Sequence, residues 1–591
     1  MKPVSRQQMQ KVRRRLKRLY GDEHDIERMQ ERLFRMVGRY GVGLQKTETI
    51  GPSKRWNESD SVLITYGDMI RKDGETTLRS LRDFCREHLK SSIKTVHILP
   101  FSPYSSDDGF SVIDYREVDP NLGGWEDVVS LGMDFQLMFD LVLNHCSAES
   151  TWFRDFCSGI APARYYFLEM DPEMDLSDVV RPRSSPLLTK VLTRDGESHV
   201  WTTFSADQVD LNWQNPDVFF EFVDILFLYI SMGCRIVRLD AVAFLWKVPG
   251  TACIHLPETH EMVKLLRDIV EMLAPHVLLL TETNVPHEEN VSYFGNGDEA
   301  HMVYNFSLPP LVLHGLLNED ARLLTQWAHD LNAAPRGCTF FNFTASHDGI
   351  GMRPLQGLVE DADIDALAEQ MKAKGGRVNY RSMPDGSQRP YELNITYFDA
   401  LRMPGDDALS LARFLCSQAL MLAFKGVPAV YFHSLVGTPN YQEGVERTQH
   451  NRTINRRKYA RDELDAVLAV KDGLQARVFR RYQQMLRRRA RHPAFHPDGP
   501  QVVHNGGKNL FILERTSPDG NESVMCLFNF TAKKQVIGGS RGTPLLGSAS
   551  SAYDILSQKS VSFGTKGLSL EPFQAVWLTV PSKRAASNGK R

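Results

Sequence analysis

Short apolar runs rich in β-branched residues recur along the chain from about residue 60, separated by longer helical or loop segments. Eight such runs are visible, at residues 62–68, 95–100, 137–145, 235–242, 277–284, 301–306, 338–348 and 428–434. Strands that alternate with helical segments are typical of βαβ units, and eight of them predict a closed (β/α)8 barrel. Polar residues end most of these runs, at the strand ends where barrels place their chemistry.

Helical periodicity precedes the barrel, and two long insertions interrupt it. Apolar residues recur at helical spacing at Met9, Val12, Leu16, Leu19, Ile26, Met29, Leu33 and Met36. These positions predict two amphipathic helices that pack on the main body. The whole pattern divides the chain into a helical extension (1–58), a first barrel part (59–145), an inserted subdomain over the barrel mouth (146–207), a second barrel part (208–496) with an active-site insertion (350–405), an antiparallel β domain (497–581) and a disordered tail (582–591).

Composition and charge narrow the classes of function. The chain has 591 residues, of which 42% are hydrophobic and 24% charged, an ordinary globular composition. Its net charge of -2 gives no global reason to expect nucleic acid or an anionic membrane as a partner. Residues 2–20 carry eight basic residues and no acid, so nucleic-acid binding stays open as an alternative, although helix packing is the favoured interpretation.

The cysteines and the apolar stretches bear on metal binding and location. The eight cysteines are scattered, with no C-x-x-C pair and no Cys/His cluster, so we expect free thiols and no metal site. The start of the chain lacks the apolar segment of a signal peptide, and no apolar stretch is long enough to cross a membrane. A reducing cytoplasm is the expected location. No pattern in the sequence indicates an oligomeric state.

Three acids end three different predicted strands: Asp240, Glu282 and Asp348. A barrel brings the ends of all its strands to one rim, so these acids are expected to converge. Cleavage of a glycosidic bond with retention needs a carboxylate nucleophile and a protonated carboxylic acid about 5 Å apart. Arg238 lies two residues before Asp240 on the same strand, so it points to the same side and is expected to keep that acid ionised at a low pKa.

Four short segments then carry a family resemblance. Residues 140–145, 238–242, 281–284 and 346–348 resemble, in the same order, four conserved regions of the α-amylase family, glycoside hydrolase family 13, and residues 208–212 resemble a fifth. This resemblance implies that Asp240 is the nucleophile, Glu282 the general acid/base and Asp348 the transition-state stabiliser.

The same resemblance implies a glucose subsite lined by Arg238, His145 and His347, each able to donate to sugar hydroxyls. Asn144 stands where many amylases bind structural calcium. No second set of ligands accompanies it in this sequence, so we expect no metal.

Further segments resemble one branch of the family, the sucrose phosphorylases. Residues 107–115 resemble the segment that grips glucose there, with Asp107 in the gripping position, and residues 181–183, 250–253, 391–394 and 451–456 also match. The resemblance implies a glycoside phosphorylase, a hexosyltransferase that uses inorganic phosphate as co-substrate and needs no cofactor. It places Arg452 near the sugar and Arg183, Tyr391 and Asn394 near phosphate and acceptor.

Departures from plain sucrose phosphorylases bear on the leaving group. The N-terminal helices and residues 244–247, 250–257, 283–287 and 440–446 resemble the members of the branch that split 2-O-α-glucosylglycerate into α-glucose 1-phosphate and D-glycerate. Lys247 and His255 would put positive charge near an anionic leaving group. A solvent-exposed or helix-capping Lys247 is an equal alternative.

Other functions stay open at this point. A donor with fructose 6-phosphate as leaving group would want the same positive charge, so phosphorolysis of sucrose 6-phosphate or sucrose is an alternative. Hydrolysis of an α-glucoside is a second alternative, because water competes for any glucosyl-enzyme. A non-catalytic amylase-like scaffold is a third, against which the intact set of acids argues.

Overall fold

A closed barrel of parallel strands forms the centre of the molecule. The computed structural model describes residues 5–21, 23–41, 51, 54–183, 185–382, 387–537, 551–563 and 567–580. The barrel order is β1-β16-β12-β11-β10-β9-β4-β3. These strands are β1 Val62–Thr65, β3 Thr95–Ile98, β4 Gln136–Val142, β9 Cys234–Asp240, β10 Leu278–Thr281, β11 Met302–Tyr304, β12 Thr339–Asn342 and β16 Val427–Tyr431. Each overlaps one predicted run, which confirms the predicted (β/α)8 barrel.

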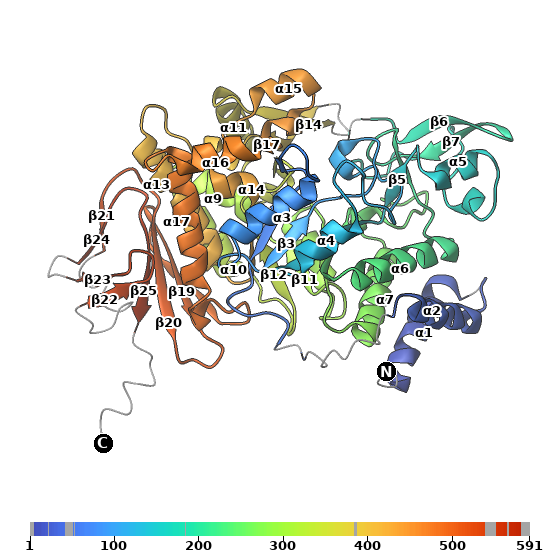
Figure 1. Cartoon of the computed structure of the whole chain (residues 1–591), viewed down its shortest axis with the longest axis horizontal. Helices are drawn as coiled ribbons and strands as arrows, with labels where there is room; N and C mark the ends of the chain where they lie inside the picture. The colour runs from blue at the N-terminus through green and yellow to red at the C-terminus, as the bar shows by residue number, and fades with distance from the viewer. Residues whose placement is uncertain are drawn as a thin grey trace.

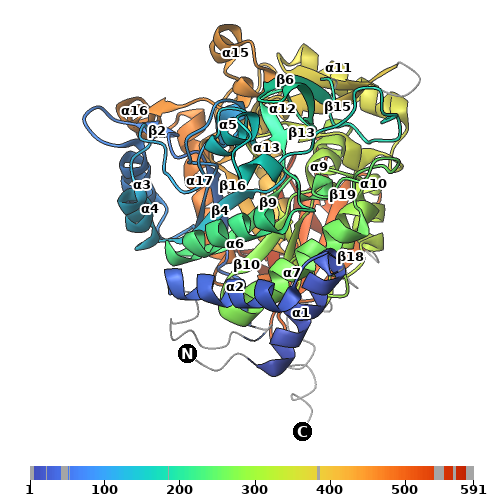
Figure 2. The ribbon, with the colours of Figure 1, turned by 90° about the vertical axis from the view of Figure 1, so that its right-hand side faces the viewer.

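Helices surround the barrel and cover the outer face of its strands, while side chains of the strands fill the interior (Figures 1 and 2). The main ones are α3 Thr77–His88, α4 Trp125–Gly132, α6 Pro216–Ser231, α7 Pro257–Leu273, α9 Leu308–Leu317, α10 Arg322–Asp330, α13 Asp407–Ala423 and α17 Leu474–Arg489. Leu63, Val237 and Leu280 on three of the strands are fully buried. Burial on both faces explains why these strands read as continuous apolar runs rather than as alternating patterns.

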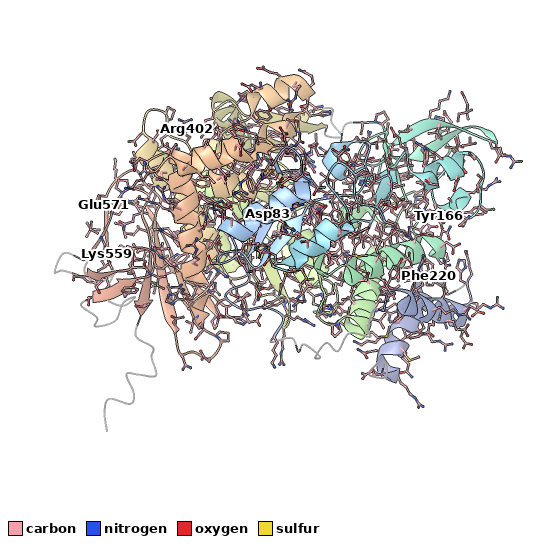
Figure 3. The ribbon with its side chains drawn as sticks, in the orientation of Figure 1. Asp83, Tyr166, Phe220, Arg402, Lys559 and Glu571 are labelled. Atoms are coloured by element: carbon pink, nitrogen blue, oxygen red, sulfur yellow. The ribbon has the colours of Figure 1, made fainter. Side chains whose placement is uncertain are left out.

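Two N-terminal helices cover the outside of the barrel helices. Helix α1 (Arg6–Tyr20) packs on α7 and α2 (Ile26–Tyr40) packs on α6, at one end of the molecule in Figure 2. Val12, Leu16 and Leu33 are buried as predicted, whereas Met9 is exposed. The guanidinium of Arg32 on α2 lies 4.2 Å from the ring centroid of Phe220, labelled on α6 in Figure 3. The amphipathic pattern therefore reflects packing on the main body, as expected.

The basic residues of α1 face acids of the barrel. Arg15 is 3.1 Å from Glu261 and 3.2 Å from Asp268, both on α7, and its side chain is only 15% exposed. Arg18 also pairs with Glu261 at 3.3 Å. Part of the positive charge in residues 2–20 is thus neutralised within the chain, which removes much of the support for a nucleic-acid surface.

Two insertions lie at the carboxyl end of the strands (Figure 2). The first contains β5 (His145–Ser147), α5 (Thr151–Cys157), the hairpin β6 (Leu188–Thr193) and β7 (Gly196–Trp201), and β8 (Gln208–Asp210), which pairs with β5. The second contains β13 (Ile350–Gly351), α11 (Asp361–Ala373), β14 (Arg377–Ser382) and β15 (Gln388–Asn394) in a sheet of order β13-β15-β14. Both insertions therefore stand over the rim where the acids were expected.

An antiparallel sheet follows the barrel, on the left of Figure 1. Its order is β18-β19-β20-β25-β22-β23, with bounds β18 Gln501–Asn505, β19 Leu510–Thr516, β20 Ser523–Asn529, β25 Ala575–Val580, β22 Ser551–Asp554 and β23 Lys559–Ser562. Arg515 is fully buried and donates to the carbonyl oxygen of Ala423 at 2.7 Å, which ties the sheet to α13. The predicted disordered tail, residues 582–591, lies outside the described residues. No helix in the described ranges has the length and apolarity to cross a membrane.

Candidate active site

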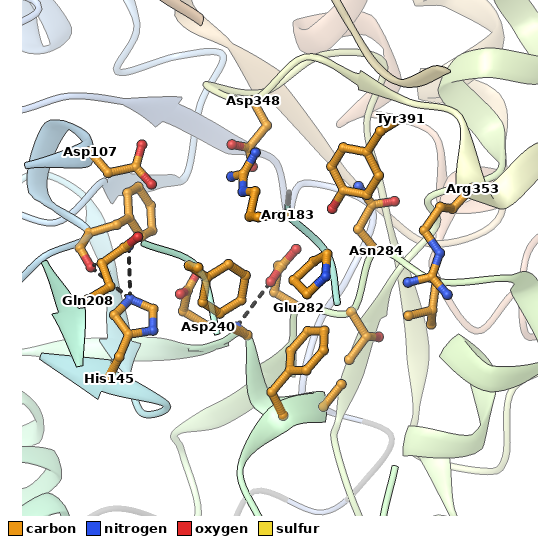
Figure 4. Close-up of a pocket in the computed structure, with 18 of the residues that line it drawn as sticks. Asp107, His145, Arg183, Gln208, Asp240, Glu282, Asn284, Asp348, Arg353 and Tyr391 are labelled. Carbon is orange, nitrogen blue, oxygen red and sulfur yellow. Dashed lines mark hydrogen bonds between the residues drawn. The ribbon is translucent and has the colours of Figure 1, made fainter. Parts of the chain in front are cut away.

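A pocket at the carboxyl end of the barrel collects most of the predicted site residues (Figure 4). Ten of the thirteen line it: Asp107, His145, Arg183, Arg238, Asp240, Glu282, His347, Asp348, Tyr391 and Arg452. They come from the rim of the barrel and from both insertions. Lys247, Asn394 and His255 are the three that the structure does not place there, and Nε2 of His255 lies 3.1 Å from Glu289 instead.

The predicted nucleophile and general acid lie on neighbouring strands. The β9/β10 register pairs Leu239 with Thr281, so Asp240 and Glu282 follow side by side. Neighbouring strands are about 4.8 Å apart, which is close to the roughly 5 Å between the two carboxyl groups of retaining glycosidases. The backbone N–H of Ala241 donates to Oε2 of Glu282 at 3.1 Å, and Figure 4 draws this bond. Oε2 is thus occupied as an acceptor, which leaves Oε1 to carry the acidic proton.

The charge on these two carboxyl groups is set by burial as well as by Arg238. Nη1 of Arg238 donates to Oδ1 of Asp240 at 2.7 Å. Burial nevertheless raises the pKa of Asp240 well above its usual range, with Arg238 opposing and Glu282 adding to the rise. The prediction of a low pKa for Asp240 is therefore wrong in direction, because the sequence shows the charged partner but not the loss of solvent.

Glu282 is perturbed in the same direction. Its pKa is raised by burial, against the opposing effect of Arg238. Two buried carboxyl groups side by side repel each other when both are ionised, which favours retention of one proton by the pair. Arg238 bonds directly to Asp240, which favours the negative charge there and the proton on Glu282. This is the ionisation state that a retaining mechanism requires.

Asp348 has the opposite environment. Burial alone would raise its pKa, but Arg452 and Arg456 outweigh burial and hold the pKa below its usual range. Nη1 of Arg452 is 2.6 Å from Oδ1 of Asp348, and the same side chain pairs with Glu392 at 2.7 Å. Asp348 therefore stays ionised in the pocket, as a carboxylate that stabilises positive charge would have to.

The backbone is strained at Asp107 and Asp108 and at Ala241, which follows Asp240. Asp107 and Asp108 have φ of 52° and 48°, and Ala241 has φ of 49°, a left-handed conformation that non-glycine residues seldom adopt. At Ala241 this conformation aims the N–H at Glu282. Asp107 lies 3.8 Å from Arg456 and 3.9 Å from Arg452, which fixes its carboxylate at the pocket wall.

Both predicted sugar-binding histidines are neutral. The ring of His347 stacks on Phe110 at 4.8 Å between centroids, and burial lowers its pKa well below its usual range. Burial also lowers the pKa of His145, whose Nε2 lies 2.9 Å from the carbonyl oxygen of Phe110 and whose Nδ1 lies 3.3 Å from Nδ2 of Asn144. Protein groups thus face both ring nitrogens of His145, and Gln208 adjoins it in Figure 4.

The position of Lys247 matches neither of its two predicted roles, a cation near the leaving group or an exposed or helix-capping lysine. It is neither near the leaving group nor exposed, because its ammonium is buried 2.6 Å from Oδ2 of Asp210 and 2.6 Å from Oδ1 of Asn144. The Asn144 oxygen that would bind calcium thus already accepts from a lysine, so these residues do not fit a metal ion. Among the described residues no group of three or more His, Cys, Asp or Glu side chains is placed to hold a metal.

Asn394 is also misplaced by the prediction. It is fully buried at the end of β15, opposite Arg377 of β14, and does not line the pocket. The prediction rested on the resemblance of residues 391–394 as a segment, of which Tyr391 does reach the pocket. Successive side chains of a strand point to opposite faces, so an offset of three residues moved Asn394 to the other side.

Several pocket residues were not predicted individually. Asn284 and Arg353 line one side of the pocket, and Phe204, Gln208 and Phe244 line another part of it. Asn284 lies two residues after Glu282, within residues 281–284 that resemble a conserved region of the family, so its place near a strand end was the available signal. Arg353 lies in the 3-10 turn Arg353–Leu355 of the second insertion, where no periodicity points to a pocket.

Comparison with known proteins agrees with this geometry. Residues 90–348 match the family description "Alpha amylase, catalytic domain". A glucosylglycerate phosphorylase from Spirochaeta thermophila is 50% identical over 81% of this chain and 82% of its own length. One from Escherichia coli is 41% identical over 96% of this chain and 100% of its own length. The chain belongs to the glucosylglycerate phosphorylase group of the α-amylase family. Sucrose phosphorylases, such as that of Agrobacterium vitis at 31% identity, are more distant members of the same family.

A solved structure extends the comparison to the fold. The crystal structure of sucrose 6F-phosphate phosphorylase from Thermoanaerobacter thermosaccharolyticum aligns with a TM-score of 0.70 and 26% identity, covering 80% of this chain and 94% of that one. The predicted family and its phosphorylase branch are therefore confirmed. Enzymes of this group are glycoside phosphorylases, which transfer hexosyl groups.

Proposed function

We propose that this protein cleaves 2-O-α-glucosylglycerate with inorganic phosphate, with retention, and gives α-glucose 1-phosphate and D-glycerate. The observation that carries this proposal is the pocket in which Asp240, Glu282 and Asp348 converge, with Arg238 bonded to Asp240 and Arg452 paired with Asp348. The choice of glucosylglycerate as the donor substrate is supported by the relatives at 41% to 50% identity, which are named glucosylglycerate phosphorylases. We also propose that the reaction takes place in a reducing cytoplasm.

The first half-reaction forms a glucosyl ester. An oxygen of the Asp240 carboxylate attacks the anomeric carbon, and the bond from that carbon to O2 of glycerate breaks. The proton on Glu282 passes to the departing oxygen, so glycerate leaves with a hydroxyl group. Positive charge develops on the sugar ring in the transition state, and the ionised Asp348 stabilises it.

The second half-reaction uses phosphate instead of water. An oxygen of phosphate attacks the same carbon from the face that glycerate left, and the ester bond to Asp240 breaks. Glu282, now a carboxylate, accepts the proton from the attacking phosphate. Two inversions restore the α configuration in glucose 1-phosphate.

Residues around the acids divide into two groups by role. We assign Asp107, His145, Arg238, His347 and Arg452 to the glucose side, where the last four surround the buried acids. Arg183 and Tyr391 belong to the phosphate side, and the guanidinium carbon of Arg183 is 6.0 Å from the centroid of the Tyr391 ring. A guanidinium offers several donors in one plane, which suits a phosphate oxyanion.

The test is product release from matched donors. The purified protein is incubated with phosphate and, in parallel, with glucosylglycerate, sucrose 6-phosphate, sucrose and glucosylglycerol. Release of glucose 1-phosphate from glucosylglycerate in preference to the other three would support the proposal. Release of free glucose would favour hydrolysis, preference for sucrose 6-phosphate or sucrose would replace the donor, and no product from any of the four would favour a non-catalytic scaffold.

A further inference from the structure

The charged residues of the pocket are paired on one side and unpaired on the other. Arg238 bonds to Asp240, and Arg452 pairs with Asp348 and Glu392. Within the described part of the chain, no carboxylate lies within ion-pair distance of Arg183 or Arg353, and Nε of Arg353 is buried without a hydrogen-bond partner. The cations on the glucose side are therefore held in direct ion pairs, whereas among the described residues Arg353 has no such partner and Arg183 acts on Asp348 only from beyond ion-pair distance.

These two arginines border the same part of the pocket. Figure 4 shows Tyr391 and Asn284 between them, with Arg353 on the side of Glu282 away from Asp107 and His145 and Arg183 beside Asp348. Both guanidinium groups act on the Tyr391 phenol, since each lowers its pKa against the rise that burial causes. Oδ1 of Asn284 is buried and has no hydrogen-bond partner in the part of the chain that the structure describes. The lining is thus rich in unused polar atoms next to the general acid.

We propose that Arg183 and Arg353 form one anion site that holds, in turn, the carboxylate of the departing glycerate and the phosphate that replaces it. This inference rests on the proposed function and adds Arg353 as the residue that selects an anionic leaving group. The other cations of the pocket are bound to carboxylates, and its two histidines are neutral because burial lowers their pKa. Whichever anion stands beside Glu282, these two arginines are the charges available to it.

The geometry of the two ligands fits one site. The carboxylate of glycerate is attached to the carbon that bears the glycosidic oxygen, so its oxygens lie three bonds from that oxygen. The free oxygens of phosphate lie two bonds from the oxygen that attacks the same anomeric carbon. Both sets of anionic oxygens therefore fall at a similar distance from the sugar. Glycerate has to leave before phosphate enters, so the site is used in sequence and not shared at one moment.

The experiment compares two donors that differ only in charge. Glucosylglycerate and 2-O-α-glucosylglycerol share the glucosyl group and carbon skeleton, but the second has a hydroxymethyl group in place of the carboxylate. In a two-step mechanism of this kind, kcat/KM for the donor reports only the first half-reaction and kcat/KM for phosphate only the second. Each anion is therefore measured separately in the same protein.

The variant is Arg353→Gln, with Arg353→Lys as the conservative partner. We expect Arg353→Gln to lower the preference for glucosylglycerate over glucosylglycerol about 100-fold, because a charge-assisted hydrogen bond is lost only with the anionic donor. We expect kcat/KM for phosphate to fall by about the same factor. Arg353→Lys should restore part of both losses, since it returns the charge without the planar fork.

The control is Arg389→Gln, which removes an arginine from the same strand as Tyr391. Arg389 pairs with Asp361 and Asp365 at the surface and is outside the pocket, so this variant should keep the wild-type preference. An equal loss on both donors would show that Arg353 only supports the fold of the insertion. An unchanged kcat/KM for phosphate would show that the two anions use different sites. Either result overturns the inference, whereas absence of activity of the wild-type protein on glucosylglycerate would overturn the proposed function itself.

Discussion

Replacing Lys247 by Met is the sharpest test of the buried charge beneath the pocket. Asp210 is fully buried and Lys247 is 1% exposed, so neither charge is hydrated. In the variant the Asp210 carboxylate keeps three neutral donors: the backbone N–H of Thr203 at 2.8 Å, its hydroxyl at 2.6 Å and Nδ2 of Asn144 at 2.9 Å. It loses its only compensating positive charge within hydrogen-bond distance among the described residues.

The magnitude follows from these contacts. Removing one partner of a buried ion pair costs about 3 to 5 kcal/mol, since it leaves an uncompensated charge. The three remaining hydrogen bonds keep the carboxylate partly solvated, so we expect the lower end, about 3 kcal/mol of unfolding free energy. That corresponds to a rise of about 150-fold in the unfolding equilibrium constant. Methionine has a similar volume to the lysine stem, so little of this loss would come from packing.

The assay is urea unfolding of a double-mutant cycle. Lys247→Met, Asp210→Asn and the double variant are unfolded in parallel, and the coupling energy is taken from the departure from additivity. We expect the double variant to recover about 2 kcal/mol relative to the sum, because it buries no charge. Lys190→Met is the matched control. Lys190 pairs with Glu197 at the surface of the first insertion, which also contains Asp210, and both side chains of this pair are more than half exposed.

Two results would refute the reasoning. A loss of less than about 1 kcal/mol in Lys247→Met would mean that the carboxylate is not stranded by removal of the ammonium. Additivity of the two single variants would mean that Lys247 and Asp210 act independently.

The remaining predictions concern the acids and the N-terminal helices. Asp240→Asn should abolish glucosyl-enzyme formation with every donor, whereas Glu282→Gln should retain much more activity on glucosyl fluoride than on glucosylglycerate; equal losses on the fluoride would contradict the two roles. Glu282 must be protonated to act, so activity with glucosylglycerate should fall as pH rises through its raised pKa. Arg452 lowers that pKa, so Arg452→Gln should move this basic limb of the kcat/KM profile to higher pH, and an unmoved limb would separate Arg452 from the acid. Arg15→Met should lower the free energy of unfolding by about 1 to 2 kcal/mol, because it removes one cationic partner from each of two largely buried acids, which keep Arg18 and Lys11, and exposed Arg14→Met, the control, should change it by less than about 0.5 kcal/mol.

The barrel and its acids were predictable for a clear physical reason. Parallel strands buried on both faces leave continuous apolar runs, and the polar residue that ends each run faces the rim. The convergence of Asp240, Glu282 and Asp348 therefore follows from the sequence alone. Division of the chain into domains at particular residues stays a prediction.

What the sequence could not supply was the environment of single side chains. Lys247 meets Asp210 and Asn144 from two other segments, so neither its burial nor its partners follow from its neighbours in the chain. The predicted direction of the pKa shift at Asp240 was wrong for the same reason, because the desolvation of its carboxyl group depends on the assembled pocket. Arg353 was missed because it lies in an irregular turn of an insertion, where spacing carries no information.

The two sides of the pocket are inherited from different parts of the chain. The acids and most of the glucose contacts grow from the barrel rim, whereas Arg183 comes from the first insertion and Arg353 and Tyr391 from the second. The sequences of the insertions can therefore change during evolution without disturbing the strands that hold the acids. The same barrel and catalytic acids can thus serve many acceptors. Exchange of these two insertions between relatives is therefore a route to phosphorylases with new leaving groups.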